Sequence, residues 1–401
     1  METKIFKIDP LNINRDIIRR ASEIIQNRGL VAFPTETVYG LGANALDPKA
    51  VTKVFEAKKR PFDDPIILHI STVEDLYKLV EDVPPEAIRI INRFWPGPLT
   101  MILKKTDLVP DIVTTGFNTV AIRMPSNPVA RELIKACGVP IAAPSANLFG
   151  RPSPTKAHHV LEDLSGRIDC IIDGGDTEIG VESTVIEFTS GPVKVLRPGG
   201  IDIEDINLIV RGIEMVSESE DIKKSPGWYP QHYSPQANVT IVNNSVNQVE
   251  DVLEKAKSFV SKGDRVGIMA KQEHENHYKN FVCKIIGPEK DLRTCAARLF
   301  SLLREFDQEK VDIIIAEGIS EEGIGLAVMN RLRKAAGPEI ASSDLNDQIS
   351  PEKKISEVKI VDDQNLDDQI VEERTFDDQL FDDQFDADQT ADNRLKDFDN
   401  Q

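Results

Sequence analysis

Residues 30–42 read LVAFPTETVYGLG, and this stretch of apolar residues followed by hydroxyl groups and glycines decides the predicted fold. The apolar run 30–33 predicts a short buried strand. Before it, apolar residues recur at helical spacing between Ile13 and Ile25, and Gly29 stands where a left-handed helix cap is expected. Open α/β sheets bind ligands at the carboxyl ends of their strands. Residues 34–42 are therefore a candidate ligand loop, with an ordinary polar loop as the alternative, and they do not form a P-loop motif.

The alternation of strand and helix patterns continues along the chain and predicts two α/β domains. Further buried strands are predicted at 66–70, 99–103, 119–123, 140–143, 170–173 and 183–186, with helical patterns between many of them. Residues 211–238 lose this periodicity and are rich in turn chemistry, which predicts a linker. A smaller α/β pattern then returns, with strands predicted at 239–242, 265–269 and 311–315. We therefore expect domains at 1–210 and 239–338, joined by a linker at 211–238.

The charge of the chain is concentrated in its last segment. Of the net charge of −19 over 401 residues, residues 341–401 carry −13, from 19 acidic against six basic side chains, which leaves −6 for the rest. A nearly balanced body can still hold a local basic site, so the overall acidity does not exclude an RNA partner. The four cysteines form no C-x-x-C pair, and neither a membrane-spanning run nor a secretory signal is expected. These features favour a cytoplasmic enzyme or binding protein.

Residues 339–401 are an acidic, low-complexity tail that repeats the unit DDQ four times, from 362 to 384. Its apolar residues are too sparse to offset the conformational entropy of folding, which predicts disorder. A solubilising tail is the favoured interpretation. A docking peptide that uses the interspersed phenylalanines is the alternative.

Two short motifs could hold a polyphosphate. Lys58-Lys59-Arg60-Pro61 lies at the end of a predicted helix, and Pro144-Ser145-Ala146-Asn147 follows a predicted strand. A polyphosphate needs several converging cations, and hydroxyl and amide oxygens can contact phosphate or hydrated Mg²⁺. Each motif also has a simpler explanation when it is taken alone. The basic residues of the first can complement the dipole of the helix that they end, and the second can be an ordinary capped turn. Together they point to a phosphate-binding site.

The motifs as a set resemble the YrdC-like domain, whose K-x-R and S-x-N motifs match residues 58–60 and 145–147. PTETVYGLG (34–42), WPGPLT (95–100), ESTV (182–185) and LRPGG (196–200) match it too. The resemblance covers about residues 10–338 and is to the long, two-domain form of the threonylcarbamoyl-AMP synthase (L-threonylcarbamoyladenylate synthase) family. It implies a YrdC-like twisted mixed sheet, followed by a smaller Rossmann-like α/β domain and the acidic tail.

The family's reaction joins L-threonine, bicarbonate or CO2, and ATP to give threonylcarbamoyl-AMP and pyrophosphate. A partner tRNA threonylcarbamoyl transferase then passes the group to tRNAs that read codons starting with A, and a contact with tRNA or double-stranded RNA is a further implied partner. By matching motif, the residues implied to hold L-threonine are Thr35, His69, Arg123, Ala143 and Ser183. Those implied to hold ATP, its phosphates and Mg²⁺ are Lys58, Arg60, Thr119, Ser145, Asn147, Ser153 and Arg197, with Tyr233 closing over the nucleotide. Lys58, Arg60, Ser145 and Asn147 are the implied catalytic residues, with Mg²⁺ near the last two.

Some of these roles make chemical sense from the residues alone. Arg123 offers a fork that suits a carboxylate, although a structural arginine at a strand end is the alternative. His69 lies on an apolar strand, where a satisfied core histidine is common. No Ser-His-Asp or Cys-His arrangement stands out in the sequence, and positioned cations can stabilise charge that builds on pyrophosphate without a covalent nucleophile.

Three further features of the sequence each lead to a prediction of their own. The linker reads Trp228-Tyr229-Pro230-Gln231, where family linkers carry a basic residue, so we expect its closure to depend on aromatic packing. Gly323-Ile324-Gly325 predicts a helix start, and His274 with His277 predicts a solvated surface and not a metal site.

A non-catalytic RNA-binding module and a carbamoyl-adenylate enzyme of hydrogenase maturation are the rival functions. The second rival expects zinc-finger cysteine arrays, which this sequence lacks.

Overall fold

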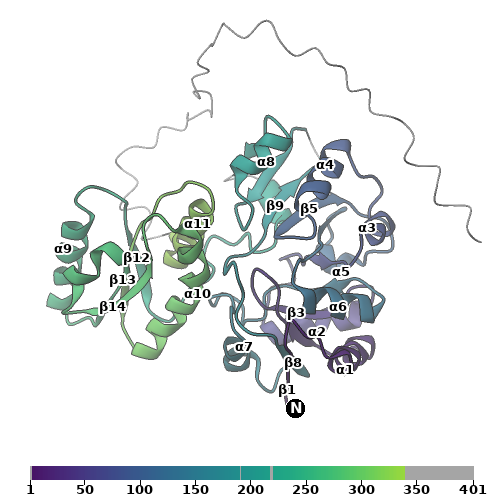
Figure 1. Ribbon diagram of the computed structural model, residues 1–401, viewed down its shortest axis with the longest axis horizontal. Helices are drawn as coiled ribbons and strands as arrows, with labels where there is room; N and C mark the ends of the chain where they lie inside the picture. The colour runs from purple at the N-terminus through teal and green to yellow at the C-terminus, as the bar shows by residue number, and fades with distance from the viewer. Residues whose placement is uncertain (1, 190, 217–219, 339–401) are drawn as a thin grey trace, which may run out of the picture. The chain divides into compact units, whose positions relative to one another are not determined.

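The computed structural model describes residues 2–189, 191–216 and 220–338, and the acidic tail lies outside these residues. The described residues form two sheets (Figure 1). The first has the order β1-β8-β2-β3-β7-β4-β6-β5-β9-β10-β11, and the second the order β12-β15-β13-β14. The α/β class and the mixed first sheet predicted from the sequence are confirmed.

The first sheet is built from β1 (Lys4–Lys7), β2 (Val31–Phe33), β3 (Gly40–Asn44), β4 (Leu68–His69), β5 (Leu99–Lys104), β6 (Thr119–Arg123), β7 (Ile141–Ala142), β8 (Cys170–Asp173), β9 (Thr184–Glu187), β10 (Lys194–Arg197) and β11 (Glu214–Met215). Its helices are α1 (Arg15–Gln26), α2 (Pro48–Lys58), α3 (Val73–Leu79), α4 (Pro85–Phe94), α5 (Asp111–Thr114), α6 (Pro128–Cys137), α7 (Ala157–Leu164) and α8 (Ile203–Ile209), and the 3-10 helix η1 (Glu220–Lys224) lies in the linker. Helices α1 and α6 share one apolar cluster with β2 and β8, whereas α2, α3, α4 and α7 contribute to a larger one. Sequestering apolar surface on both faces is the main stabilising term for such a sheet.

The strand pairing brings distant residues to one end of the sheet. Strand β4 pairs in parallel with β6, so that His69 lies opposite Arg123, although they are 54 positions apart in sequence. Strand β3 runs antiparallel to β2 and also pairs with β7. This pairing brings the polar loop of residues 34–39, which connects β2 and β3, close to the loop that follows β7. A mixed sheet therefore gathers the candidate motifs where its strands end.

The end of α1 corrects one prediction. The left-handed residue is Arg28, with φ 63°, and not Gly29. The Arg28 N–H donates to Ile25 O, and the Gly29 N–H donates to Ile24 O, which is a Schellman motif displaced by one residue from the predicted cap. Gly29 is required for space, because a Cβ there would lie 2.4 Å from Ile24 Cγ2.

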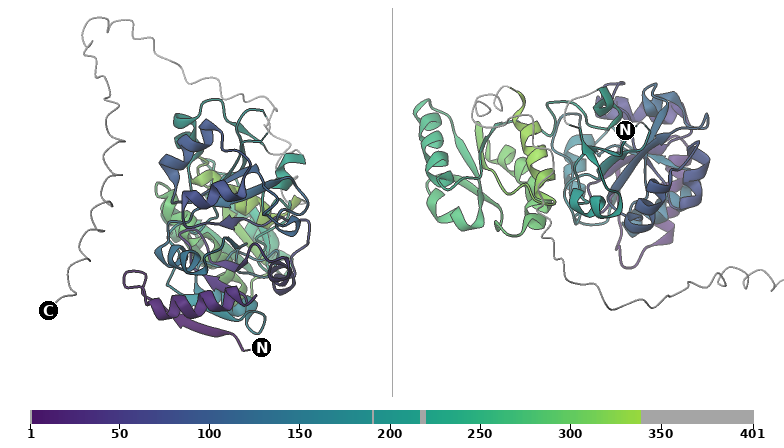
Figure 2. Two further views of the ribbon diagram at one scale, coloured as in Figure 1. Left: turned by 90° about the vertical axis from the view of Figure 1, so that its right-hand side faces the viewer. Right: turned by 90° about the horizontal axis from the view of Figure 1, so that it is seen from above.

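The second sheet is parallel throughout the described residues. It consists of β12 (Asn238–Val242), β13 (Val266–Lys271), β14 (Val282–Gly287) and β15 (Ile313–Glu317). Its helices are α9 (Gln248–Ser261), η2 (Gln272–Tyr278), α10 (Leu292–Glu309) and α11 (Gly325–Ala336), which begins at Gly325 as the sequence predicted. Helix α9 covers one face, and α10 and α11 cover the other (Figures 1 and 2). None of the described helices has the length and apolar character to cross a membrane.

Helices α10 and α11 also contact the first domain. One apolar cluster combines Val38 and Val181 with Leu299, Phe300 and Leu332. Two buried arginines add ion pairs to this contact, Arg304 with Asp163 at 2.7 Å and Arg331 with Glu182 at 2.9 Å. The two sheets therefore share a part of their cores.

Candidate active site

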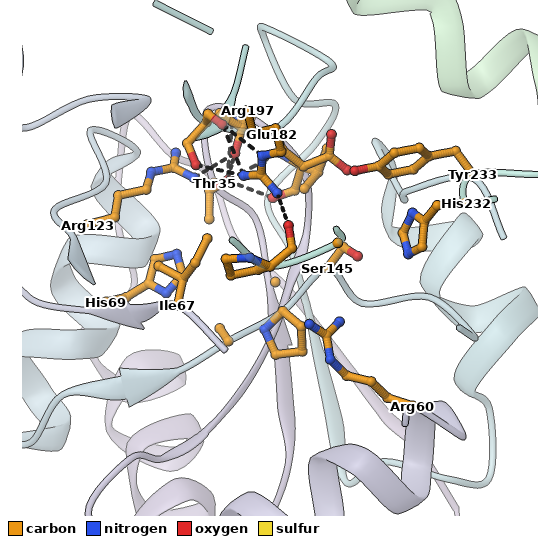
Figure 3. A pocket seen from close by; sticks show the side chains of 18 residues that line it. Thr35, Arg60, Ile67, His69, Arg123, Ser145, Glu182, Arg197, His232 and Tyr233 are labelled. Atoms are coloured by element: carbon orange, nitrogen blue, oxygen red, sulfur yellow. Dashed lines mark hydrogen bonds between the residues drawn. The ribbon is translucent and has the colours of Figure 1, made fainter. Parts of the chain in front are cut away.

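A pocket lies where the polar loops of the first domain meet the linker (Figure 3). Three buried arginines line it, Arg60, Arg123 and Arg197, together with hydroxyl groups and His69. The linker contributes Pro226, Gly227, His232 and Tyr233. Only about 50 Å³ of the pocket is open to a water molecule, whereas ligand sites usually measure roughly 300–1,000 Å³. In this arrangement the pocket is therefore too small for a nucleotide, and part of its lining must move to admit one.

The loop after β2 is held by its own hydroxyl groups. Thr35 Oγ1 accepts from the Thr37 and Val38 N–H groups, at 3.2 Å each, and lies 2.6 Å from Val38 O. Thr37 Oγ1 in turn accepts from Arg123 Nη1 at 2.9 Å. The turn is therefore ordered by its own hydroxyl groups and by Arg123 before a ligand binds.

Arg123 is already engaged by the protein. Its Nη2 lies 2.6 Å from Glu36 Oε1, and its Nε donates to Gly97 O at 3.2 Å. Burial alone would raise the pKa of Glu36, but Arg123 outweighs it and the pKa is lowered. Glu36 and Arg123 are therefore a buried ion pair beside the pocket, and the arginine offers less free charge than its fork geometry alone would indicate.

His69 faces the same pocket in its neutral form. Burial, followed by the neighbouring Arg123, lowers the pKa of His69 to about 3. Its Nδ1 atom is buried and makes no hydrogen bond within the described residues. A buried polar atom without a partner costs free energy, so this nitrogen is a candidate contact for a ligand. The alternative of a satisfied core histidine does not describe it.

Lys58 holds the S-x-N loop from behind. Its side chain is 1% exposed, and Nζ donates to Ser145 O at 2.5 Å, Asn147 O at 2.6 Å and Asn147 Oδ1 at 3.4 Å. Lys59 caps α2 in the left-handed conformation, with φ 54°, between Lys58, which contacts the S-x-N loop, and Arg60, which lines the pocket. Burial and then Arg60 lower the pKa of Lys58 well below its ordinary value. Lys58 therefore orders the loop and does not line the pocket.

Arg60 lines the pocket and is tied to the linker through one carboxylate. Its Nη2 lies 2.9 Å from Asp64 Oδ1, and the same oxygen accepts from the Gly227 N–H at 2.9 Å. Lys334 Nζ donates to Gly227 O at 2.7 Å from the other domain. Both domains therefore hold the linker at Gly227, which closes it over Arg60.

The linker is also held by aromatic packing, as the sequence predicted. Trp228 and Tyr229 stack with centroids 4.4 Å apart, and Tyr229 meets Phe149 edge to face at 5.2 Å. The Tyr229 hydroxyl donates to Asp63 Oδ1 at 2.6 Å. Of these two ring pairs, only the contact with Phe149 joins the linker to the first domain, and such a pair adds about 0.5–1.5 kcal/mol beyond area burial.

Ser183 and Arg197 form the opposite wall. Arg197 Nη2 donates to Ser183 O at 3.0 Å and to Ser183 Oγ at 3.1 Å, and its Nη1 donates to Pro226 O at 2.9 Å. These acceptors are uncharged oxygens, so Arg197 keeps positive charge available for an anion. The backbone is close-packed at this wall, because a Cβ on Gly199 would lie 2.2 Å from the Ser183 carbonyl carbon.

Of the residues that the resemblance implied, most meet at this pocket and four do not line it. Those that line it are Thr35, Arg60, His69, Arg123, Ala143, Ser145, Ser183, Arg197 and Tyr233. Asn147 belongs to the S-x-N loop and donates to Leu148 O, Lys58 donates to that loop, and Ser153 donates to Glu182 Oε1 at 2.6 Å. Thr119 begins β6, at the far end of the strand from Arg123 and roughly 13 Å away at about 3.3 Å per residue.

Several lining residues have no predicted role, including Thr37, Glu182, Gly227 and His232. Each lies inside or beside one of the sequence motifs, so proximity to the motifs was the available signal. Glu182 is the most consequential of them, because it brings a buried carboxylate to a pocket rich in arginine.

The described residues contain no cluster of three or more histidine, cysteine or acidic side chains that could hold a metal ion. At the predicted Mg²⁺ position, Asn147 Oδ1 already accepts from Ser145 Oγ at 2.5 Å and lies 3.4 Å from the Lys58 ammonium. These two donors already occupy Asn147 Oδ1, so Asn147 does not fit as a direct Mg²⁺ ligand in this arrangement. Ser145 lines the pocket and remains the candidate contact for a metal that arrives with phosphate.

The two histidines considered as a metal pair differ from the sequence prediction in part. His277 is exposed, but His274 is half-buried and its Nδ1 lies 2.7 Å from Glu317 Oε1. Tyr278 donates to the same oxygen at 2.6 Å. His274 therefore belongs to a polar cluster at the end of β15 and is not simply solvated.

The fold and the pocket define a two-domain α/β protein with a buried, arginine-lined pocket beside its linker. The family described as Telomere recombination matches residues 23–199, and the C-terminal domain of threonylcarbamoyl-AMP synthase matches residues 201–337. The threonylcarbamoyl-AMP synthase of Pyrococcus abyssi is 47% identical over 325 residues, which cover 80% of this chain and 94% of the relative. That of Bacillus subtilis is 45% identical over 344 residues, which cover 84% and 99%.

A solved structure agrees with these relatives. The crystal structure of P. abyssi Sua5 complexed with L-threonine matches with a TM-score of 0.79 and 46% identity, over 83% of this chain and 98% of that one. The chain belongs to the threonylcarbamoyl-AMP synthase family, in its two-domain form.

Proposed function

We propose that this chain synthesises L-threonylcarbamoyl-AMP from L-threonine, bicarbonate or CO2, and ATP, with release of pyrophosphate. The observation that carries the proposal is the convergence of Arg60, Arg123 and Arg197 with the hydroxyl groups of Ser145 and Ser183 on one closed pocket. Family membership and the L-threonine complex of the P. abyssi relative support it. A cytoplasmic setting and delivery of the product to a tRNA threonylcarbamoyl transferase complete the proposal, with contact to tRNA or double-stranded RNA as a further possibility to test.

The threonine end of the pocket consists of Thr35, His69, Arg123, Ala143 and Ser183. The neutral His69 offers an unpartnered Nδ1, which suits a polar group of the amino acid better than a second cation would. Ser183 Oγ is held between Arg197 and Thr100, at 3.1 and 2.7 Å, so its position is fixed before the substrate arrives. Pre-ordered groups reduce the entropy that binding must overcome.

The nucleotide end consists of Arg60, Ser145, Arg197 and Tyr233. A carbamate oxygen of N-carboxythreonine attacks the α-phosphorus of ATP, and the bond from that phosphorus to the bridging oxygen breaks to release pyrophosphate. Negative charge grows on the leaving group, and Arg60 and Arg197 are placed to stabilise it. Ser145 would contact Mg²⁺ that arrives with ATP, and the metal would supply neutralisation of phosphate charge. Catalysis then depends on position and electrostatics, and no covalent intermediate with the protein is required.

Residues outside the pocket lining have supporting parts in this proposal. Lys58 and Asn147 order the S-x-N loop, and Ser153 contacts Glu182. Thr119 begins β6 and does not line the pocket, so its contact with the nucleotide stays a prediction. Entry of ATP itself requires part of the pocket lining to move, since the closed pocket leaves about 50 Å³.

The test is pyrophosphate release by the purified full-length chain, with ATP, L-threonine and bicarbonate omitted one at a time. We expect release only when all three are present. Arg60→Met should lower the rate by roughly 100-fold or more, as for other groups that stabilise developing charge. The matched control is Arg93→Met, which removes an exposed arginine on α4 and should leave the rate within about twofold. Release that does not depend on L-threonine would exclude the proposed function.

A further inference from the structure

Arg331 reaches from the second domain into the wall of the pocket. It lies on α11 and is completely buried. Its Nε donates to Glu182 Oε2 at 2.9 Å, and its Nη1 donates to Pro198 O at 2.7 Å. Its guanidinium carbon lies 5.7 Å from the centre of the Tyr233 ring. One side chain of the C-terminal domain therefore contacts a lining carboxylate, the strand end that carries Arg197, and the linker tyrosine.

Glu182 is the centre of this arrangement. While Oε2 accepts from Arg331, Oε1 accepts from Ser153 Oγ at 2.6 Å. Burial alone would raise the pKa of Glu182, but Arg331 and then Arg197 outweigh it and lower the pKa to about 2. Glu182 is thus an ionised carboxylate in the wall of a pocket that must receive a polyphosphate.

An ionised carboxylate beside phosphate is repulsive unless a cation compensates it. Arg197 already serves Ser183 and the linker, whereas Arg331 is the cation hydrogen-bonded to Glu182 within the described residues. Of the other titratable groups that face Glu182, Lys334 lies on α11, and His232 and Tyr233 lie on the linker. Burial lowers the pKa of His232 and of Lys334, so neither is a dependable counter-charge.

We propose that Arg331 is a positioning residue for nucleotide binding: it neutralises Glu182 and holds it, so that Glu182 orients Ser153 and leaves the charge of Arg197 to the phosphates. The inference rests on the proposed function and assigns the C-terminal domain a direct part in the active site. Arg331 acts through Glu182 and does not itself line the pocket.

The competing explanation is that Arg331 only joins the two domains. Arg304 offers the matched comparison, because it is 2% exposed, lies on α10 and crosses the same boundary to Asp163 at 2.7 Å. Its partner Asp163 is not a lining residue of the pocket. Loss of Arg304 therefore weakens the domain contact without leaving an uncompensated carboxylate at the nucleotide.

The experiment compares four variants of the full chain. Three of them change Arg331: Arg331→Met, Arg331→Lys, and the double variant that combines Arg331→Met with Glu182→Gln. The fourth is Arg304→Met. The Kd of ATP by calorimetry, and the KM for ATP with kcat, are measured between about pH 6 and pH 9. At the upper pH, Arg331→Met should raise both the Kd and the KM by at least about tenfold with a smaller effect on kcat, because an unpaired buried charge repels the phosphates. Both constants should recover as the pH is lowered, since Glu182 then takes up a proton.

The double variant should return both constants to within about threefold of the parent and lose the pH dependence that Arg331→Met shows beyond the parent, because the charge of Glu182 no longer needs compensation. Arg331→Lys should give a Kd and a KM between those of the parent and those of Arg331→Met. It keeps the test usable if the methionine variant folds poorly. Arg304→Met should melt at a lower temperature with a parent-like pH profile. Equal defects in the single and double variants, or the same pH dependence in Arg304→Met, would overturn the inference. Parent protein that binds ATP but makes no product with L-threonine would instead reject the proposed function, and the Kd series still decides the inference.

Discussion

Lys58→Met tests whether the lysine of the K-x-R motif acts on the loop or on the ligand. The ammonium of Lys58 donates to two main-chain oxygens of the S-x-N loop, at 2.5 and 2.6 Å, and is 1% exposed. Methionine fills a similar volume but donates no hydrogen bond. The substitution therefore leaves Ser145 O and Asn147 O without the donor that they share.

The size of the effect follows from these contacts. A buried acceptor that loses its partner costs about 1–3 kcal/mol, so the two carbonyls together cost roughly 2–6 kcal/mol. Removing a buried ammonium recovers part of this, because charge burial is itself unfavourable. We expect a net loss near 2–3 kcal/mol in the free energy of unfolding, or a fall in Tm of roughly 5–10 °C. A loop displaced by about 1 Å would also lower the rate of pyrophosphate release by about 100-fold.

The assay is thermal unfolding followed by circular dichroism, together with the pyrophosphate assay. Lys59→Met is the matched control, because it makes the same change one residue further on, at an exposed side chain in the left-handed cap. It should melt within about 2 °C of the parent, as surface substitutions usually do. If Lys58→Met melts like Lys59→Met while losing activity, the lysine acts on the ligand and the loop-ordering argument is wrong.

Three further changes probe the backbone and the linker. Gly199→Ala places a Cβ 2.2 Å from the backbone and should weaken ATP binding and lower Tm, whereas Gly138→Ala, with no heavy atom within 4 Å of its Cβ, should cost only about 1 kcal/mol. Lys334 has its pKa lowered to about 7 by burial and then Arg331, so between pH 7 and its ordinary 10.5 the unfolded chain binds more protons. Stability should rise across this range in the parent relative to Lys334→Met. Asp64→Ala removes the acceptor of the Gly227 N–H and should speed hydrogen exchange of the linker.

Each of these expectations has a contrary result. Equal melting of the two glycine variants would show that the backbone around Gly199 can yield. A stability difference between the parent and Lys334→Met that stays level or falls from pH 7 to 10.5 would contradict the assigned titration. If the Gly227 N–H exchanges at the parent rate in both Asp64→Ala and Asp64→Asn, other contacts hold the linker closed.

The elements of strong apolar periodicity were predictable from the sequence. The strands at 99–103 and 119–123 appear as β5 and β6 because their residues bury on both faces of a sheet. Strand β3 was taken for a loop because GLGAN lacks the branched side chains typical of strands. Its glycines have a packing reason, since a Cβ on Gly42 would lie 2.8 Å from Ile141 and Phe33. Such a reason is invisible until the neighbouring strands are known.

The residues of the candidate site were largely predictable, but their partners were not. The motif K-x-R gives no sign that Lys58 contacts the S-x-N loop while Arg60 lines the pocket, because the S-x-N loop lies far along the chain. The pairing of Arg123 with Glu36 was hidden because the two lie on separate elements. Likewise Glu182 stands in a motif that the sequence showed, while its counter-ion Arg331 lies 149 positions further on. Contacts between distant segments carry no local signal, so only the folded chain reveals them.

The buried arginines that cross between the domains bear on how this enzyme could be divided or rebuilt. A chain ended after the linker would keep every pocket motif of the first domain, yet Glu182 would lose its hydrogen-bonded cation and Val181 would face water. The first domain is therefore not a portable module in this protein. Grafting it onto another scaffold, or exchanging its C-terminal partner, would require a replacement for the guanidinium of Arg331 as well as an apolar cover.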